Sequence, residues 1–236
     1  MDVAVQIVLT GLTLGSMYAL AAVGLSLIFG TLGMFNMAHG LFMTLGAYSA
    51  MSIVNLLGLP PVLGLLAAMV VSALIGVLTH LAIVRWMLSK PEFETNIMVA
   101  TAGLAILLQD ILLKTYGGYP FPQPIRIEGA FRIAGVSVSL QSVFILVMAL
   151  VLIGAVAWLL LKTRFGRAIR ATAMNRDAAR LMGVRTNTVY LQVMALAGAL
   201  AGMAGLLIST LTTLSPQMGD LPQRSGPVSV LVHDGC

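Results

Sequence analysis

Two polar residues inside an uncharged stretch could bind a small polar molecule. Residues 3–84 contain no Asp, Glu, Lys or Arg, yet they include Asn36 and His39. A polar group without a partner in lipid costs several kcal/mol, so these side chains should face a cavity, the headgroup boundary or another polar group. A broken helix beside them would offer backbone N–H groups to a substrate carboxylate. Alternatively, the two residues only stabilise the turn between two membrane spans.

Other polar residues lie near the ends of expected spans. Asp110 follows Gln109 close to the end of an apolar run, and Lys114 lies four residues further on. Asp110 either pairs with Lys114 at the outer interface, which is the favoured interpretation, or lines a pathway. His80 is expected to be packed or interfacial.

The sequence contains no pattern typical of an enzyme. The three histidines, at positions 39, 80 and 233, are isolated and show no metal-ligand spacing. A GxxxxGK[ST] phosphate loop is also absent, so any ATP must be bound by a separate subunit. No basic and aromatic surface suited to nucleic acid is apparent. We therefore expect no catalytic residue, no metal and no cofactor in this chain.

Composition indicates an integral membrane protein. The 236 residues are 59% hydrophobic and 9% charged, and the mean hydropathy is +1.00. A bilayer core requires roughly 20 apolar residues per helix. The apolar runs predict an all-α polytopic transmembrane helix bundle with about six spans, near residues 3–29, 41–57, 62–88, 96–113, 142–161 and 188–211. Small-xxx-small spacings at Gly11/Gly15 and Gly198/Gly202 predict close helix packing.

Charge is concentrated in residues 163–184, TRFGRAIRATAMNRDAARLMGV. Together with Lys162 and Arg185, this segment holds seven of the thirteen basic residues of the chain. The positive-inside rule places it in the cytoplasm, with the N-terminus and the Pro-rich loop 114–140 outside. That loop is expected to contain a short hairpin around 131–138.

Within the charged segment, residue spacing predicts a short helix that is capped by Asn175 or Asp177 and ends at Gly183. Such a helix is exposed and would gain stability by docking into a protein groove. A plain positive-inside loop without a partner is the alternative.

The motif Asp177-Ala178-Ala179-xxx-Gly183 resembles the EAA-xxx-G signature of the membrane subunits of ABC importers, with Asp in place of Glu. RAIRATAMNRDAARLMGV is similar to the version found in branched-chain amino-acid permeases of the LivH/LivM type. Residues 11–48, with their Asn-x-Ala-His-Gly centre, 101–110 and 214–219 resemble further blocks of that family in the same order. The resemblance covers the chain to about Pro222.

The resemblance implies a permease subunit of an ATP-driven importer for branched-chain amino acids in the bacterial inner membrane. It implies ATP-binding subunits, a second permease and an extracytoplasmic binding protein as partners. The coupling residues implied are Arg170, Asn175, Asp177, Ala178, Ala179 and Gly183. The pathway candidates are Asn36, His39, Gly40, Thr101 and Gln109. A urea or short-amide permease is the alternative within the class, whereas a passive channel gives no reason for the coupling motif.

The last residues differ from the rest of the chain. Residues 1–222 are expected to form the permease domain, with the coupling segment at 163–184, whereas 223–236 have neither the length nor the apolarity of a span. Family members usually continue with further apolar spans. This tail suggests a truncation or frame change, so a non-transporting product is a third hypothesis.

Overall fold

The computed structural model describes residues 2–88, 90, 92–125, 127, 129–133 and 136–215. The expected tail, 223–236, lies outside the described residues. In chain order the elements are α1 (Asp2–Leu32), α2 (His39–Asn55), α3 (Pro61–Thr79), the π-helix η1 (His80–Val84), α4 (Arg85–Met87), α5 (Phe93–Tyr116), β1 (Ala130–Ile133), β2 (Val136–Ser139), α6 (Leu140–Lys162), α7 (Arg164–Met174), α8 (Arg176–Leu181) and α9 (Thr186–Leu211).

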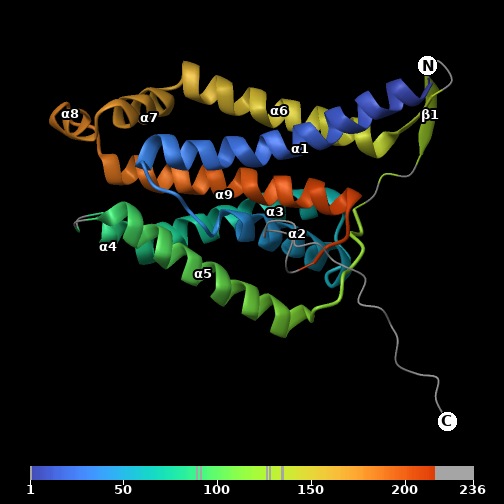
Figure 1. Cartoon of the computed structure of the whole chain (residues 1–236), viewed down its shortest axis with the longest axis horizontal. Coiled ribbons are helices and arrows are strands. Elements are labelled where there is room, and N and C mark those ends of the chain that lie inside the picture. Colours follow the sequence, from blue (N-terminus) through green and yellow to red (C-terminus); the bar gives the residue numbers. More distant parts are fainter. Residues whose placement is uncertain are drawn as a thin grey trace, which may run out of the picture.

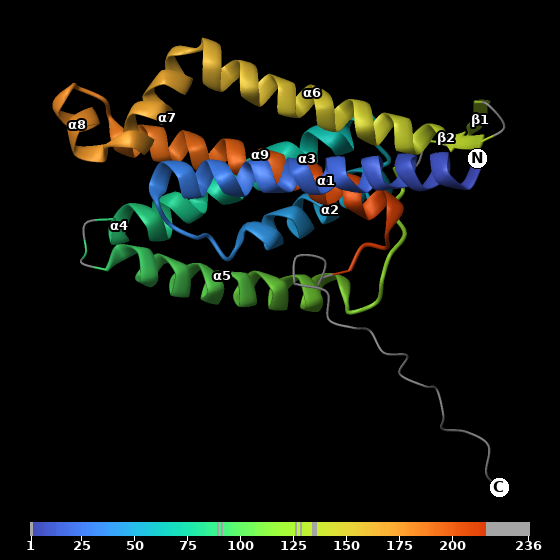
Figure 2. The same ribbon diagram turned by 45° about the horizontal axis from the view of Figure 1, so that its top comes forward.

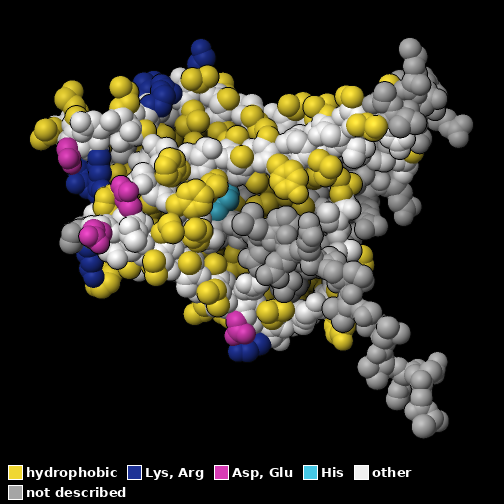
Figure 3. All heavy atoms as spheres, in the orientation of Figure 1, with side chains coloured by type: hydrophobic (Ala, Val, Ile, Leu, Met, Phe, Trp, Pro, Cys, Tyr) yellow, Lys and Arg dark blue, Asp and Glu magenta, His cyan; other side chains and the backbone are white. Residues whose placement is uncertain are grey.

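The long helices run side by side and define two ends of an elongated bundle (Figure 1). The N-terminus and the β1–β2 hairpin lie at one end, and α4, α7 and α8 lie at the other, as the turned view also shows (Figure 2). The basic side chains visible in Figure 3 gather mainly at the end with α4, α7 and α8. This arrangement matches the alternation expected from the sequence, with the charged segment and the N-terminus on opposite sides.

Five helices among the described residues are long and apolar enough to cross a membrane: Val5–Leu32, Pro61–Met87, Phe93–Tyr116, Leu140–Lys162 and Thr186–Leu211. Their outward faces carry exposed Leu, Val and Ile side chains, as lipid contact requires. These findings confirm the predicted all-α membrane bundle. The sixth expected span corresponds to α2, which has 17 residues.

Helix α2 is short because the chain turns back into the bundle before it begins. After α1 ends, residues 33–38 run inward, and α2 starts beside the C-terminal half of α1, where His39 meets Ala21 (Figure 1). The reversal uses Gly33 at a φ of +70°, a conformation that glycine adopts readily. This break in the helical structure lies where the sequence suggested a broken helix.

Helix α9 is the centre of the bundle, since 72% of the residues in its most apolar stretch are buried. A Cβ atom at Gly198 would overlap the Ser72 carbonyl of α3, and one at Gly205 would overlap the Met43 backbone of α2. Glycine therefore permits backbone contact here, as the spacing of Gly198 and Gly202 predicted. By contrast, Gly11 and Gly15 have no atom of this chain within 4 Å of such a Cβ, so their expected close packing is not made within the described chain.

The loop between α5 and α6 folds over the end that carries the N-terminus. Strands β1 and β2 pair antiparallel with Phe131 opposite Val138, as predicted from the sequence. Phe121 and Leu214 exchange two backbone hydrogen bonds of 2.9 Å. Gln123 is 1% exposed, and its Nε2 donates to Ser209 Oγ at 2.8 Å. The loop is therefore attached to the end of α9.

Candidate functional site

The coupling segment starts with a sharp turn between α6 and α7. Thr163 Oγ1 accepts a hydrogen bond from Gly166 N at 3.0 Å and donates one to Leu159 O at 2.6 Å. A Cβ at Gly166 would overlap the Leu160 carbonyl, which also accepts a hydrogen bond from Arg170 Nη1. These contacts fix the direction in which α7 leaves the membrane span.

Helix α8 is a short capped helix that carries Asp177, Ala178 and Ala179 of the signature motif, and Gly183 follows its end. Asn175 Oδ1 accepts hydrogen bonds from Asp177 N at 3.0 Å and Ala178 N at 2.9 Å, which caps the helix as predicted. At the other end, Gly183 has a φ of +84°, and Val184 N donates to Ala179 O at 3.0 Å. This is the glycine C-cap geometry, and it explains why the motif ends in glycine.

Most of the predicted coupling residues are exposed, and one is not. Arg170, Asn175, Asp177, Ala178 and Gly183 are exposed, so a partner could contact them. Ala179 is 5% exposed and packs inward. Its position in the motif therefore serves the packing of α8 rather than an outer contact.

Three apolar side chains on the coupling segment project into solvent. Met174 and Leu181 are each 89% exposed and Met182 is 85% exposed. Sequence reasoning did not single out Leu181 and Met182, although apolar residues inside an otherwise charged segment were the available signal. Strongly exposed apolar groups outside the membrane are typical of a docking surface.

Helix α8 is also joined to the start of α9. Arg180 Nε donates to Thr186 Oγ1 at 3.0 Å, and Thr186 is buried at 4% exposure. A displacement of α8 would therefore act on the N-terminus of the central helix.

The polar break between α1 and α2 brings together three of the predicted pathway residues. Asn36, His39 and Thr101 are each 5% exposed or less. His39 Nε2 lies 3.2 Å from Ala21 O of α1, and Met37 N donates to Thr101 Oγ1 of α5 at 3.1 Å. The break is thus held between α1 and α5 in the interior of the bundle.

Asn36 takes part in the turn before α2, which is one of the two interpretations that the sequence left open. Its Oδ1 accepts a hydrogen bond from Ala38 N at 3.0 Å, which stabilises the turn before α2. Its Nδ2 is buried and has no hydrogen-bond partner among the described residues, and the same holds for His39 Nδ1. Because His39 Nε2 faces a carbonyl, it must donate, so Nδ1 of the neutral ring is an acceptor. The break therefore presents one free donor and one free acceptor.

Of the other pathway candidates, Gly40 directly follows His39, whereas Gln109 lies further along α5. Gly40 is in the first turn of α2, where its carbonyl accepts from Thr44 Oγ1 at 3.4 Å. Gln109 is partly buried and lies eight residues beyond Thr101 on α5, or about 12 Å along the helix axis. The structure does not bring Gln109 to the break.

Two interface predictions are consistent with the structure. Asp110 Oδ2 pairs with Lys114 Nζ at 2.7 Å, with both side chains more than half exposed, as the interface interpretation requires. His80 is buried and its Nε2 lies 3.2 Å from Asn187 Oδ1, so it is packed.

Residues 7–223 match the family model described as the permease component of the branched-chain amino acid transport system. The chain belongs to this family. It is 34% identical over 231 residues to a probable branched-chain amino acid transport permease protein LivH of Methanocaldococcus jannaschii, covering 93% of this chain and 71% of that protein. It is 29% identical to the high-affinity permease protein BraD of Pseudomonas aeruginosa, over 86% of this chain and 70% of that one.

A shorter similarity extends to the autoinducer 2 import system permease protein LsrC of Escherichia coli (strain K12 / DH10B), at 33% identity over 55% of this chain and 35% of that protein. No solved structure gives a significant match. Family membership and the apolar helices together make the chain a multi-pass permease subunit of an ABC importer, which is not an enzyme. Other components of such an importer, including its ATPase, are its partners.

Proposed function

We propose that this permease moves branched-chain amino acids, with ATP bound and hydrolysed by a separate ATPase subunit. The match of residues 7–223 to the family, together with relatives named LivH and BraD, supports this substrate. These names favour an amino acid over the urea or short-amide alternative. A second permease subunit and an extracytoplasmic binding protein complete the proposed importer.

The coupling segment is proposed to dock into the ATPase through α8. The exposed Leu181 and Met182 supply apolar contact, and Asp177 supplies a charge at the exposed first turn. The bond from Arg180 to Thr186 carries the movement of α8 to α9. Alternating access then follows from a rigid shift of the central helices.

The polar break is proposed to contact the substrate during transport. An amino acid carries one ammonium and one carboxylate. The free acceptor, His39 Nδ1, suits the ammonium, and the free donor, Asn36 Nδ2, suits the carboxylate. Neither atom is charged, so binding stays weak enough for release.

The orientation is proposed from the charge distribution. Helices α7 and α8 of the coupling segment and α4, which begins with Arg85, lie at the end of the bundle opposite the N-terminus (Figure 1). The positive-inside rule assigns that end to the cytoplasm, which places the N-terminus outside the inner membrane.

Uptake into proteoliposomes tests the substrate. The assembled importer should accumulate labelled leucine, isoleucine or valine in the presence of ATP, and it should not accumulate urea. Asn36→Ala and His39→Ala should lower uptake about tenfold or more, since a hydrogen bond to a charged group contributes about 1.5–3 kcal/mol. Thr115→Val, an exposed control on α5, should leave uptake unchanged. Normal uptake by both break variants would disprove the pathway role.

Co-purification with the ATPase tests the coupling role separately. Leu181→Asp and Met182→Asp place a charge on the exposed apolar surface and should reduce recovery of the ATPase. Thr188→Asp adds the same charge at an exposed position of the first turn of α9 and serves as the control. Equal recovery in all three variants would refute docking through α8.

A further inference from the structure

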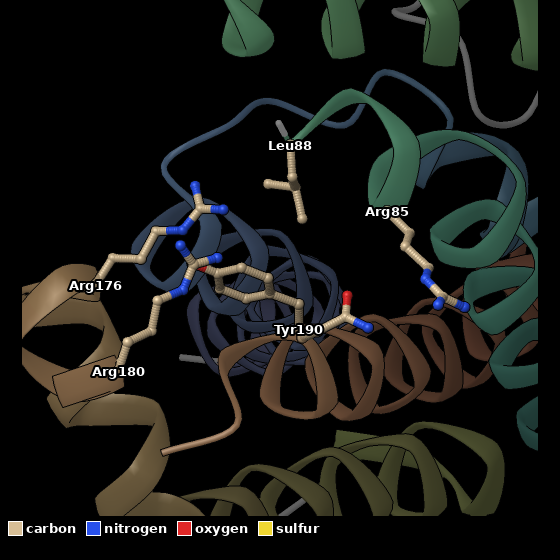
Figure 4. A pocket seen from close by; sticks show the side chains of 6 residues that line it. Arg85, Leu88, Arg176, Arg180 and Tyr190 are labelled. Atoms are coloured by element: carbon tan, nitrogen blue, oxygen red, sulfur yellow. The ribbon is translucent and has the colours of Figure 1, made fainter. Parts of the chain in front are cut away.

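A basic cavity lies between the coupling segment and the membrane bundle. Its volume is about 230 Å³, and it is found at the same end as α4 and α8. The residues that line it are Arg85, Leu88, Arg176, Arg180, Asn187 and Tyr190. Figure 4 shows Arg176 and Arg180 reaching from α8 toward the ring of Tyr190, with Leu88 pointing in from the residue after α4, whereas Arg85 of α4 lies on the other side of that ring.

The arginines of this cavity are held without ion pairs. The Arg176 guanidinium lies over two aromatic rings, with its Cζ 5.7 Å from the centroid of Phe93 and 5.4 Å from that of Tyr190. Arg180 is positioned by its bond to Thr186. Within the part of the chain that the structure describes, the ion pair that forms is Lys114–Asp110, far from this end. No acidic side chain is among the lining residues.

Arg176 and Arg180 place two guanidinium groups beside Tyr190, and Arg85 adds a third on the other side of that ring, so the cavity attracts an anion. Aromatic rings stabilise an arginine, but they do not neutralise it. Guanidinium groups bind phosphate oxygens through paired N–H donors, and their charge persists at any physiological pH. The cavity therefore has the chemistry of a phosphate site.

We propose that this cavity binds the phosphate of an acidic phospholipid headgroup. Basic pockets between transmembrane helices at the cytoplasmic side are suited to such headgroups. The cavity lies at the membrane boundary, since Trp86, next to Arg85, is 66% exposed with Lys90 Nζ 3.4 Å from its ring centroid. Leu88 supplies an apolar contact for the glycerol backbone or the start of an acyl chain.

The bound lipid would join three parts of the permease. Arg85 belongs to α4, Arg176 and Arg180 to α8, and Tyr190 to α9. A phosphate among them ties the coupling helix to the bundle. Lipid binding is independent of the substrate that is transported, so its test does not depend on the proposed substrate.

Native mass spectrometry of the assembled importer, extracted from membranes that contain phosphatidylglycerol, measures how many of these lipids stay bound. Arg85→Gln and Arg180→Gln should each lower retention about fivefold, since a basic residue near an anionic lipid contributes about 1 kcal/mol. Arg85→Lys and Arg180→Lys keep the charge and should retain most of the lipid, which separates lost binding from lost folding. Arg164→Gln and Arg167→Gln remove exposed charges outside the cavity and should have no effect.

Equal losses in the cavity and control variants would overturn the proposal, because they would indicate only general attraction to the bilayer. Unchanged retention in Arg85→Gln and Arg180→Gln would overturn it as well. Competition distinguishes the source of the phosphate. Excess inorganic phosphate should leave the lipid bound, and its displacement by inorganic phosphate would assign the cavity to a free anion instead.

Discussion

Replacement of Gly183 tests whether the folded form of α8 is what the ATPase binds. Gly183 has a φ of +84°, and nothing lies within 4 Å of a Cβ built there. Gly183→Ala therefore costs only backbone strain, about 1–2 kcal/mol for a residue with a Cβ in this region. Gly183→Asn costs less, since Asn adopts this conformation more readily than most residues.

The six residues of α8 are too few to form a stable helix alone, so its caps decide how often it is folded. A loss of 1–2 kcal/mol lowers the fraction of folded α8, and the apparent affinity for the ATPase falls with that fraction. We expect Gly183→Ala to weaken ATPase binding by up to about 5- to 30-fold and Gly183→Asn to weaken it by clearly less.

Binding is measured by titrating the purified ATPase onto the permease in nanodiscs, with substrate-stimulated ATPase activity as a second readout. Gly103→Ala provides a matched control, because it adds the same methyl group at an open position on α5 with ordinary helical φ. If Gly183→Ala and Gly183→Asn both bind the ATPase as tightly as the unsubstituted permease, the capped geometry of α8 is not what the ATPase recognises.

Three further predictions concern the bundle. Gly202→Leu should lower the thermal stability of the detergent-purified protein, because its Cβ would overlap Ala68 O in α3, whereas Gly154→Leu on the open face of α6 should not. Asp110→Asn should leave uptake and melting temperature nearly unchanged, since exposed ion pairs contribute little to stability. A large loss of uptake would instead indicate that Asp110 lines the pathway. Thr101→Val should destabilise the protein by about 1–3 kcal/mol in thermal unfolding, as it leaves Met37 N without its acceptor, and Thr101→Ser should restore most of that loss.

Sequence periodicity and charge predicted the parts of the fold that depend on local composition. The apolar runs located the long helices to within a few residues at most ends, and Asn175 and Gly183 were recognised as caps because capping chemistry is local. The position at which α2 starts, inside the bundle, was harder to predict from the sequence. It depends on contacts from His39 to α1 and from Met37 to α5, which no local pattern encodes.

For the candidate site, too, the sequence predicted single residues better than their arrangement in space. Asn36 and His39 could be chosen as polar residues in apolar surroundings, and Thr101 from the family resemblance. Gln109 met the first criterion as well, but it lies elsewhere on α5. The basic cavity could not be predicted at all, because Arg85 and Arg180 come from segments that meet only after folding. Residues distant in sequence are brought together by helix packing, which composition does not specify.

The packing of the central helices indicates where the bundle can open. Helices α2, α3 and α9 meet through backbone contacts at glycine, and Ser72 Oγ of α3 donates to Phe42 O of α2 at 2.8 Å, so these three should move as one body. Helix α5 touches this body at fewer places, chiefly around Tyr116, whose OH lies 2.7 Å from Ser52 Oγ and whose ring centroid lies 4.7 Å from that of Tyr48. Thr101 of α5 binds Met37 in the segment before α2. If α8 moves α9 as proposed, the bundle should therefore open most readily at α5, and the polar break lies on that boundary.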